Sequence, residues 1–307
     1  MKTFIKITLL AAAISLAGCG RHTSAATIYE LPLPVVPDTL RVPEDRAAYV
    51  ALHFWDAMDF TDRNLTHDTA VIEQNFANFA SVLAVAPPED AAAAIERLLQ
   101  RTVADADTVA WQLLNHTGNI YLGERDSPVY NENVYILWLR SLIDSPLIGE
   151  AGRERLNDRL TETLRNRPGD KAPDFTLVLR NGKRRQLHNL LTPGRNILIF
   201  YDHNCVDCQE ILGNLSENHE LANVRFIAVD TATESSLTIS SQTIALPDFW
   251  IAGRADENTE PDELYYLPST PTFYVLDGEG TIELKDATLK EIEALLHWEA
   301  GRQSAGC

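Results

Sequence analysis

At 307 residues the chain is too long for one ordinary hydrophobic core, so we expect two domains. Its composition, 45% hydrophobic and 23% charged, is that of a globular protein and excludes a largely disordered chain. The net charge of −18 argues against nucleic acid or an anionic membrane surface as a partner, because both require a basic face.

The beginning of the chain predicts a lipoprotein signal peptide over residues 1–18. A positively charged start precedes an apolar stretch (7–18) that is shorter than the roughly 20 residues needed to span a bilayer. The sequence LAGC at 16–19 resembles the bacterial lipobox, in which cleavage occurs before a cysteine that is then lipidated. We therefore expect a lipid on Cys19 to anchor the chain to a membrane. The alternative is an ordinary signal peptide with a coincidental cysteine.

Residues 19–42 are rich in Pro, Ser, Thr and Ala, which predicts a tether. Residues 43–166 show a helical pattern that starts with Pro43 and two acidic residues and repeats apolar residues three and four apart. The pattern predicts an all-α domain with helices at 43–60, 69–86, two within 88–118, 131–144 and 152–166. The histidines of this domain have no metal-ligand spacing, so we expect no metal there, and the pattern indicates no function.

From residue 167 the pattern changes to alternating strands and helices. Arg167-Pro168-Gly169 interrupt the last helix. Strands are predicted within 175–187 around an Asn-Gly turn and at 195–202, 223–230, 270–277 and 281–287, and helices at 209–221, 260–267 and 289–300. We therefore expect an α/β domain over 167–300, followed by a polar tail over 301–307.

Cys205 and Cys208 follow a continuous apolar strand and begin a predicted helix, where open α/β sheets place their sites. A cysteine at a helix start faces unpaired backbone N–H groups, which favour the reactive thiolate. We expect Cys205 to attack a partner's sulfur and Cys208, one turn inward, to resolve the mixed disulfide. A zinc site would need a second ligand pair, which the sequence lacks, so no metal is expected. Cys307, in the tail, is interpreted as a spare thiol.

Three segments, GDKAPDFTL, ILIFYDHNCVDC and STPTFYVLDGEG, resemble in this order the thioredoxin-like fold of the TlpA/ResA type, over roughly 167–300. The whole layout resembles a group of Gram-negative envelope lipoproteins with a helical N-terminal domain of uncharacterised role. The resemblance implies a central mixed sheet flanked by helices. It also implies a cis Pro271 that faces the cysteines, with backbone at Thr270 that pairs with an extended substrate. The redox-active disulfide of Cys205 and Cys208 would then need no other cofactor.

The sequence departs from thioredoxins near the cysteines. Asn204 stands where they usually have Trp before the first cysteine, and Ile199 stands where they carry a buried acid. Val206 and Asp207 lie between the cysteines in place of Gly-Pro. Because of these differences, a static disulfide between Cys205 and Cys208 remains an alternative to an exchanging dithiol.

Asp202 and His203 are candidates for proton transfer beside the cysteines, with a pair of ordinary surface residues as the competing interpretation. A thiol peroxidase also begins with APDF. It would need Thr three residues and Pro seven residues before its cysteine, where Asp202 and Leu198 stand, so a peroxidase is disfavoured.

The expected function is a periplasm-facing, membrane-anchored thiol–disulfide oxidoreductase that exchanges with protein disulfides of the envelope and takes electrons from an unidentified donor. Acidic neighbours oppose the Cys205 thiolate, and no basic residue lies between the cysteines, which favours a reductant with a potential on the order of −250 mV or lower. The alternative is a non-catalytic binding or scaffold lipoprotein with the same fold and a static CxxC disulfide.

Overall fold

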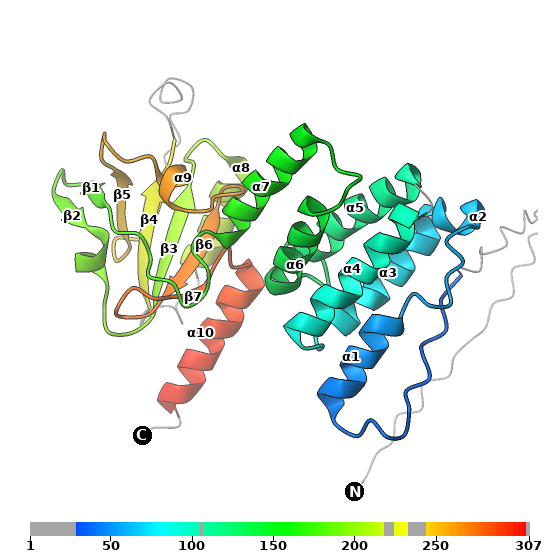
Figure 1. Ribbon diagram of the computed structural model, residues 1–307. Helices are drawn as coiled ribbons and strands as arrows, with labels where there is room; N and C mark the ends of the chain where they lie inside the picture. Colours follow the sequence, from blue (N-terminus) through cyan, green and yellow to red (C-terminus); the bar gives the residue numbers. More distant parts are fainter. Residues whose placement is uncertain (1–28, 105–106, 218–223, 233–243, 305–307) are drawn as a thin grey trace, which may run out of the picture.

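The computed structural model describes residues 29–104, 107–217, 224–232 and 244–304. A helical domain comes first, and a domain built on a sheet follows it (Figure 1). The prediction of an all-α domain followed by an α/β domain with a mixed sheet is confirmed. The predicted signal peptide, Cys19 and Cys307 lie outside the described residues.

The helical domain contains α1 (Pro43–His53), α2 (Arg63–Thr66), α3 (Thr69–Leu83), α4 (Pro88–Ala104), α5 (Thr108–Gly123), α6 (Glu132–Ile143) and α7 (Glu150–Leu164). Side chains satisfy several of the free N–H groups at helix starts. Asp68 accepts from the first turn of α3, and Asp107 and Asn131 do the same for α5 and α6. Polar residues before apolar periodic segments therefore set where these helices begin.

The helix predicted over 43–60 was too long, because α1 ends at His53 and a short α2 follows after a turn. Phe54, Trp55, Met58 and Phe60 are all at most 6% exposed and belong to the core of the helical domain. On one continuous helix these four positions would spread over more than half of the circumference, so they could not all face one core. Breaking the helix buries all four side chains.

The tether expected over 19–42 does not extend to residue 42 as a free linker. Leu31 is 7% exposed and packs into the core of the helical domain. The buried side chain of Asn75 on α3 accepts from the Leu31 N–H at 2.8 Å and donates to the Tyr29 carbonyl oxygen at 2.8 Å. The chain is therefore fixed to the helical domain from Tyr29 onward.

The second domain has a seven-stranded sheet in the order β2-β1-β5-β4-β3-β6-β7. Its elements are β1 (Thr176–Leu179), β2 (Arg184–Gln186), the 3-10 helix η1 (Leu187–Leu190), β3 (Asn196–Tyr201), α8 (Val206–Glu217), β4 (Arg225–Asp230), β5 (Ile251–Ala255), α9 (Pro261–Leu264), β6 (Thr272–Leu276), β7 (Ile282–Leu284) and α10 (Leu289–Ser304). β3 pairs with β4 in parallel and with β6 in antiparallel orientation. The sheet is therefore mixed about its central strand.

β3 is fully buried, and its alternating side chains divide between two cores. Ile197 and Ile199 face a cluster that includes residues of α8 and α10, whereas Leu198 and Phe200 face a cluster that includes the chain between Ala172 and η1. Burial on both faces explains the continuous apolar run that predicted this strand.

The sequence did not predict β5, whose residues IAGRA lack an apolar run. β5 pairs with β4 on one side and with β1 on the other. At Gly253 a Cβ would lie 2.5 Å from the Val178 carbonyl oxygen, so glycine permits this close approach of the strands. Two neighbouring strands, rather than its own composition, stabilise β5. At the other end of the domain, α10 extends to Ser304, four residues past the predicted end at 300.

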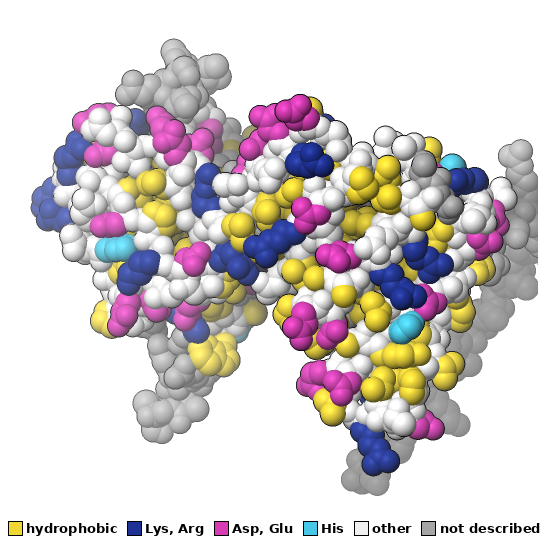
Figure 2. Space-filling view, in the orientation of Figure 1, with side chains coloured by type: hydrophobic (Ala, Val, Ile, Leu, Met, Phe, Trp, Pro, Cys, Tyr) yellow, Lys and Arg dark blue, Asp and Glu magenta, His cyan; other side chains and the backbone are white. Residues whose placement is uncertain are grey.

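Charged groups join the two domains at the end of α7. The buried Lys285 ammonium donates to the Thr163 carbonyl oxygen at 2.7 Å and lies 2.9 Å from a Glu132 carboxylate oxygen. Arg125 of the helical domain pairs with Glu291 of α10 at 2.6 Å. Figure 2 shows Lys and Arg side chains gathered at the waist between the two domains. Since a buried charge is costly without its partner, the contacts of Lys285 hold the two domains together.

Asn166, two residues after the end of α7, adds a second fixed point. Its φ is +53°, in the left-handed region that Asn tolerates. Its side chain donates to the Leu264 carbonyl oxygen at 3.0 Å and accepts from the Tyr266 N–H at 2.8 Å. The linker between the domains is therefore hydrogen-bonded to the α9 region.

The helical core depends on a glycine that faces a tryptophan. Trp138 is fully buried, and a Cβ added at Gly118 of α5 would overlap its indole. Alanine improves helix propensity by about 1 kcal/mol, but overpacking costs about 1–3 kcal/mol or more, and the indole that would have to move is fully buried. We expect Gly118→Ala to lower the free energy of unfolding of the helical domain by about 2 kcal/mol, measured by urea denaturation.

Gly213→Ala on α8 is the matched control, because nothing lies within 4 Å of a Cβ built there. This variant should be neutral or up to about 1 kcal/mol more stable. Equal stability of the Gly118→Ala variant and the wild type would show that the contact with Trp138 is not tight.

Candidate functional site

The pairing of β3 brings three separate segments to one edge of the sheet. Tyr201, the last residue of β3, is in register with Asp230 at the end of parallel β4, and Phe200 is in register with Thr272 at the start of antiparallel β6. The loop that carries Cys205 leaves β3 at this edge. The Thr270–Pro271 segment arrives at the same edge, and its peptide bond is cis, as the resemblance implied.

The two cysteines lie at the start of α8 as free thiols with different exposure. Cys205 is partly exposed directly before the helix, whereas Cys208 is 0% exposed one turn inward. The Cys208 N–H donates to Cys205 Sγ at 3.3 Å, and the Cys205 thiol donates to the Thr270 carbonyl oxygen at 3.6 Å. Both predicted elements, the CxxC and the Thr270–Pro271 segment, therefore meet at one point.

Cys208 is held as a neutral thiol. Burial raises the pKa of the Cys208 thiol to about 12, and the hydrogen bond with Cys205 acts in the same direction. Hydrogen bonds from the Asp202 backbone and the Thr270 side chain oppose this rise, but they are smaller. The apolar cluster around Cys208 includes Ile199, the residue that stands in place of a buried acid. Only Cys205 is then available to an outside sulfur.

The two candidates for proton transfer have other partners. The Asp202 carboxylate accepts from the Asn204 N–H at 2.7 Å, and the Asp202 carbonyl accepts from the Cys205 N–H at 3.1 Å, so Asp202 shapes the turn before the helix. His203 is only 9% exposed, which corrects its interpretation as a surface residue. Its Nδ1 lies 2.8 Å from an Asp230 carboxylate oxygen. Among the described residues, no hydrogen bond joins either side chain to a sulfur.

The sequence interpretation missed Asp230, which orients His203. The signal was present, because the predicted strand 223–230 ends with an aspartate and parallel neighbours end at the same edge of a sheet. Gln209 was also missed; its amide donates to the His203 carbonyl oxygen at 3.3 Å. The loop before Cys205 is thus fixed from both β4 and α8.

Asn204, directly before Cys205, has buried side-chain amide atoms with no hydrogen-bond partner in the part of the chain that the structure describes. A buried amide without partners costs roughly 1–3 kcal/mol. The position directly before Cys205 therefore carries an unsatisfied polar group, which native proteins keep only rarely.

Two family models match adjacent parts of the chain. Residues 168–285 match the AhpC/TSA family, and residues 17–166 match a domain of unknown function, DUF5106. The second domain is a thioredoxin-like domain of the AhpC/TSA family. The first match ends at residue 166 and the second begins at residue 168, shortly after α7.

Among solved structures, a thioredoxin-like protein from Bacteroides caccae is similar over both domains. It is 28% identical, with a TM-score of 0.72, over 89% of this chain and 99% of that chain. A conserved protein of unknown function from Bacteroides fragilis is 26% identical over 42% of this chain and 98% of its own, with a TM-score of 0.37. The thioredoxin domain of a thiol-disulfide oxidoreductase from Bacteroides vulgatus is 15% identical over 44% of this chain and 98% of its own, with a TM-score of 0.34. No curated protein sequence matches the chain significantly.

The thioredoxin-like fold and the AhpC/TSA domain support a redox-related role. Within the described ranges, no group of three or more His, Cys, Asp or Glu side chains could hold a metal ion. No helix in those ranges is long and apolar enough to cross a membrane.

The difference between the two thiols leads to a prediction about alkylation. Below about pH 9, Cys208 should stay protonated because its pKa is raised to about 12, and only a thiolate reacts rapidly. We expect iodoacetamide to label Cys205 at least about 100-fold faster than Cys208 at about pH 8 in the reduced, folded protein. Fragment mass spectra would assign the label within the peptide. Protein unfolded in guanidinium is the control, in which both cysteines should react at similar rates; similar rates in the folded protein would contradict the assignment.

Proposed function

We propose that the protein is a thiol–disulfide oxidoreductase in which Cys205 is the attacking sulfur and Cys208 the resolving sulfur. The observation that carries the proposal is the geometry at the helix start, where a partly exposed Cys205 accepts an amide hydrogen bond and faces the Thr270 carbonyl. The buried Cys208 lies one turn away, within reach of the same sulfur.

The exchange proceeds in two displacements. The Cys205 thiolate attacks one sulfur of a substrate disulfide, the substrate S–S bond breaks, and the other substrate sulfur leaves as a thiolate that takes up a proton. Cys208 then loses its proton and attacks Cys205 Sγ, which releases the second substrate thiol and leaves a Cys205–Cys208 disulfide. Two electrons pass from the dithiol to the substrate. A dithiol protein, as the electron donor, must then reduce the enzyme disulfide.

The substrate would bind as an extended segment beside Thr270. Among the described residues, the Thr270 N–H has no hydrogen-bond acceptor, so a substrate carbonyl oxygen can accept it. Cys205 Sγ lies next to the carbonyl of the same residue. Main-chain pairing at this point would place a substrate disulfide against Cys205 and would allow several substrate sequences.

The proposed setting is the cell envelope of a Gram-negative bacterium, with the chain held to a membrane by lipid on Cys19. This proposal rests on the LAGC sequence that follows a short apolar segment. Envelope proteins with thiols or disulfides would be the partners. We propose reduction as the direction; the proposal rests on the sequence around Cys205, which is acidic (Asp202, Asp207 and Glu210) and has no basic residue between the cysteines.

The function is tested by trapping mixed disulfides in cells. A Cys208→Ala variant cannot resolve its intermediate, so it should accumulate disulfide-linked complexes with other envelope proteins, visible on non-reducing gels. Cys205→Ala should trap none. All variants carry Cys307→Ala so that the C-terminal thiol forms no complexes, and the Cys205→Ala/Cys208→Ala double variant is the matched control.

The alternative, a static disulfide in a binding lipoprotein, gives a different result. Both single variants would then lose about 2–4 kcal/mol of stability and trap nothing. That outcome would refute the exchange function and leave a non-catalytic module.

The anchor is tested separately. Cells fed a fatty-acid analogue with a reactive tag should label the wild-type protein, whereas Cys19→Ala should stay unlabelled because the lipid is attached through that sulfur. Cys307→Ala is the control for labelling at another cysteine and should be labelled like the wild type. Equal labelling of the Cys19→Ala variant would rule out the lipid at this position.

A further inference from the structure

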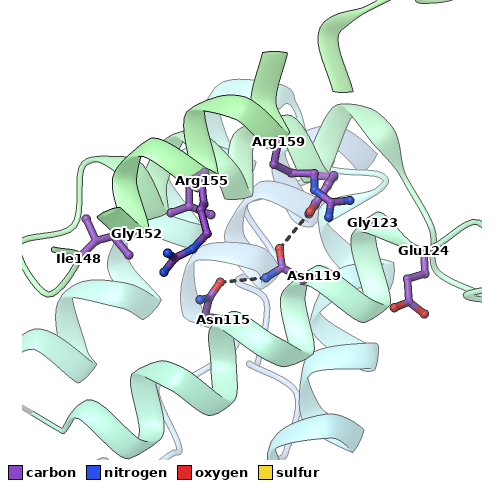
Figure 3. Close-up of a pocket in the computed structure, with 10 residues that line it drawn as sticks. Asn115, Asn119, Gly123, Glu124, Ile148, Gly152, Arg155 and Arg159 are labelled. Carbon is purple, nitrogen blue, oxygen red and sulfur yellow. Dashed lines mark hydrogen bonds between the residues drawn. The ribbon is translucent and has the colours of Figure 1, made fainter. Parts of the chain in front are cut away.

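The helical domain contains a polar pocket of about 340 Å³ between α5, α6 and α7 (Figure 3). Its lining residues are Asn115, Asn119, Gly123, Glu124, Tyr135, Ile148, Gly152, Arg155, Leu156 and Arg159. All of them belong to the helical domain, so the pocket is separate from the cysteines. Its volume lies at the lower end of the range for small-molecule sites.

Two arginines of α7 supply positive charge to the pocket. Arg155 and Arg159 are four residues apart, so they lie on one face of the helix, and both side chains reach toward α5 (Figure 3). Among the described residues, no carboxylate pairs with Arg155 within 4.0 Å, and Arg159 has only a Glu162 oxygen 4.0 Å from its Nε. In a chain with a net charge of −18, two guanidinium groups with so little neutralisation form a distinct positive site.

The floor of the pocket is an ordered chain of hydrogen bonds. The Tyr135 hydroxyl donates to Asn119 Oδ1 at 3.0 Å, and Asn119 Nδ2 donates to Asn115 Oδ1 at 3.0 Å. This chain leaves Asn115 Nδ2 as a donor without an acceptor in the described ranges, and it lies on the side of Arg155 (Figure 3). Glu124 is the acidic lining residue and lies at the end away from Arg155.

At two glycines of α5 and α7, neighbouring side chains lie close to the helix backbone beside the pocket. A Cβ at Gly123 would lie 2.7 Å from the Tyr135 ring, and a Cβ at Gly152 would overlap the Ile148 side chain. The Tyr135 ring can therefore take its position only beside a glycine at residue 123, whereas at residue 152 the end of the Ile148 side chain would have to move. Because the donors are held by packed helices, the pocket is formed before any ligand binds.

We propose that this pocket binds a small molecule that carries a carboxylate or a phosphate group. The planar, forked guanidinium group matches both anions in a bidentate manner, and two such groups with an amide donor can surround one anionic head. The remaining volume would hold the rest of a small ligand over the Leu156 and Tyr135 side chains. The helical domain would thus be a ligand-binding module, independent of the proposed exchange at Cys205.

The test is calorimetric titration of the full chain with inorganic phosphate and, separately, with citrate, at an ionic strength kept constant with chloride. We expect saturable binding of at least one probe, and the preferred probe distinguishes a phosphate ligand from a carboxylate ligand. Arg155→Gln and Arg159→Gln should each weaken binding about tenfold or more, because each removes a charge-assisted hydrogen-bond pair. Arg153→Gln is the matched control, since Arg153 lies on the same helix but donates to the Ile143 and Ile148 carbonyl oxygens.

A second measurement needs no variant. The bound probe should protect Arg155 and Arg159, but not Arg153, from modification by phenylglyoxal, as read by peptide mass. The proposal is overturned if neither probe binds above the chloride control, if Arg153→Gln weakens binding as much as the pocket variants, or if the probe protects neither pocket arginine.

Discussion

The central strand β3 is the constraint on which the candidate site depends. It is buried on both faces and hydrogen-bonded to β4 on one side and β6 on the other. Because one neighbour is parallel and the other antiparallel, the end of β4 and the start of β6 meet the end of β3 at one edge. Cys205, Asp230 and Thr270, which are far apart in the sequence, are thereby brought together. The pairing of β3 with β4 and β6 fixes the positions at that edge, whichever side chains occupy them.

The chemistry at that edge rests on a difference between two identical side chains. Cys205 lies before the helix, where it accepts an amide hydrogen bond, and Cys208 lies in the apolar layer beneath it. Ile199 stands where thioredoxins have a buried acid, so this position offers no carboxylate to take the Cys208 proton. The departing substrate thiolate, formed at Cys205, would be the nearest base when Cys208 attacks. The His203–Asp230 pair shapes the loop, and among the described residues neither side chain of the pair is hydrogen-bonded to a sulfur.

Much of this arrangement was predictable because short sequence patterns indicate the elements that form it. The apolar run of β3 and the CxxC spacing each predict a structure from neighbouring residues, whereas the cis bond at Thr270–Pro271 was implied by the resemblance to the thioredoxin-like fold. β5 was not predictable, because its two flanking strands rather than its own residues make it a strand. The end of α1 at His53 depends on a core that several other helices complete. The pocket between α5 and α7 was missed for the same reason, since no spacing in the sequence relates Asn115 to Arg155.

The contact between Asn75 and the segment Tyr29–Leu31 limits how far the protein could extend from a membrane. With lipid on Cys19, only residues 19–28 would separate the anchor from the folded domain. A chain of that length spans at most about 35 Å when fully stretched, close to the thickness of a bilayer's hydrocarbon core. The helical domain would therefore stay close to the lipid surface, and the charged junction would keep the edge with Cys205 in a fixed position relative to the helical domain. Substrates would have to approach the membrane, which would restrict them by position rather than by sequence.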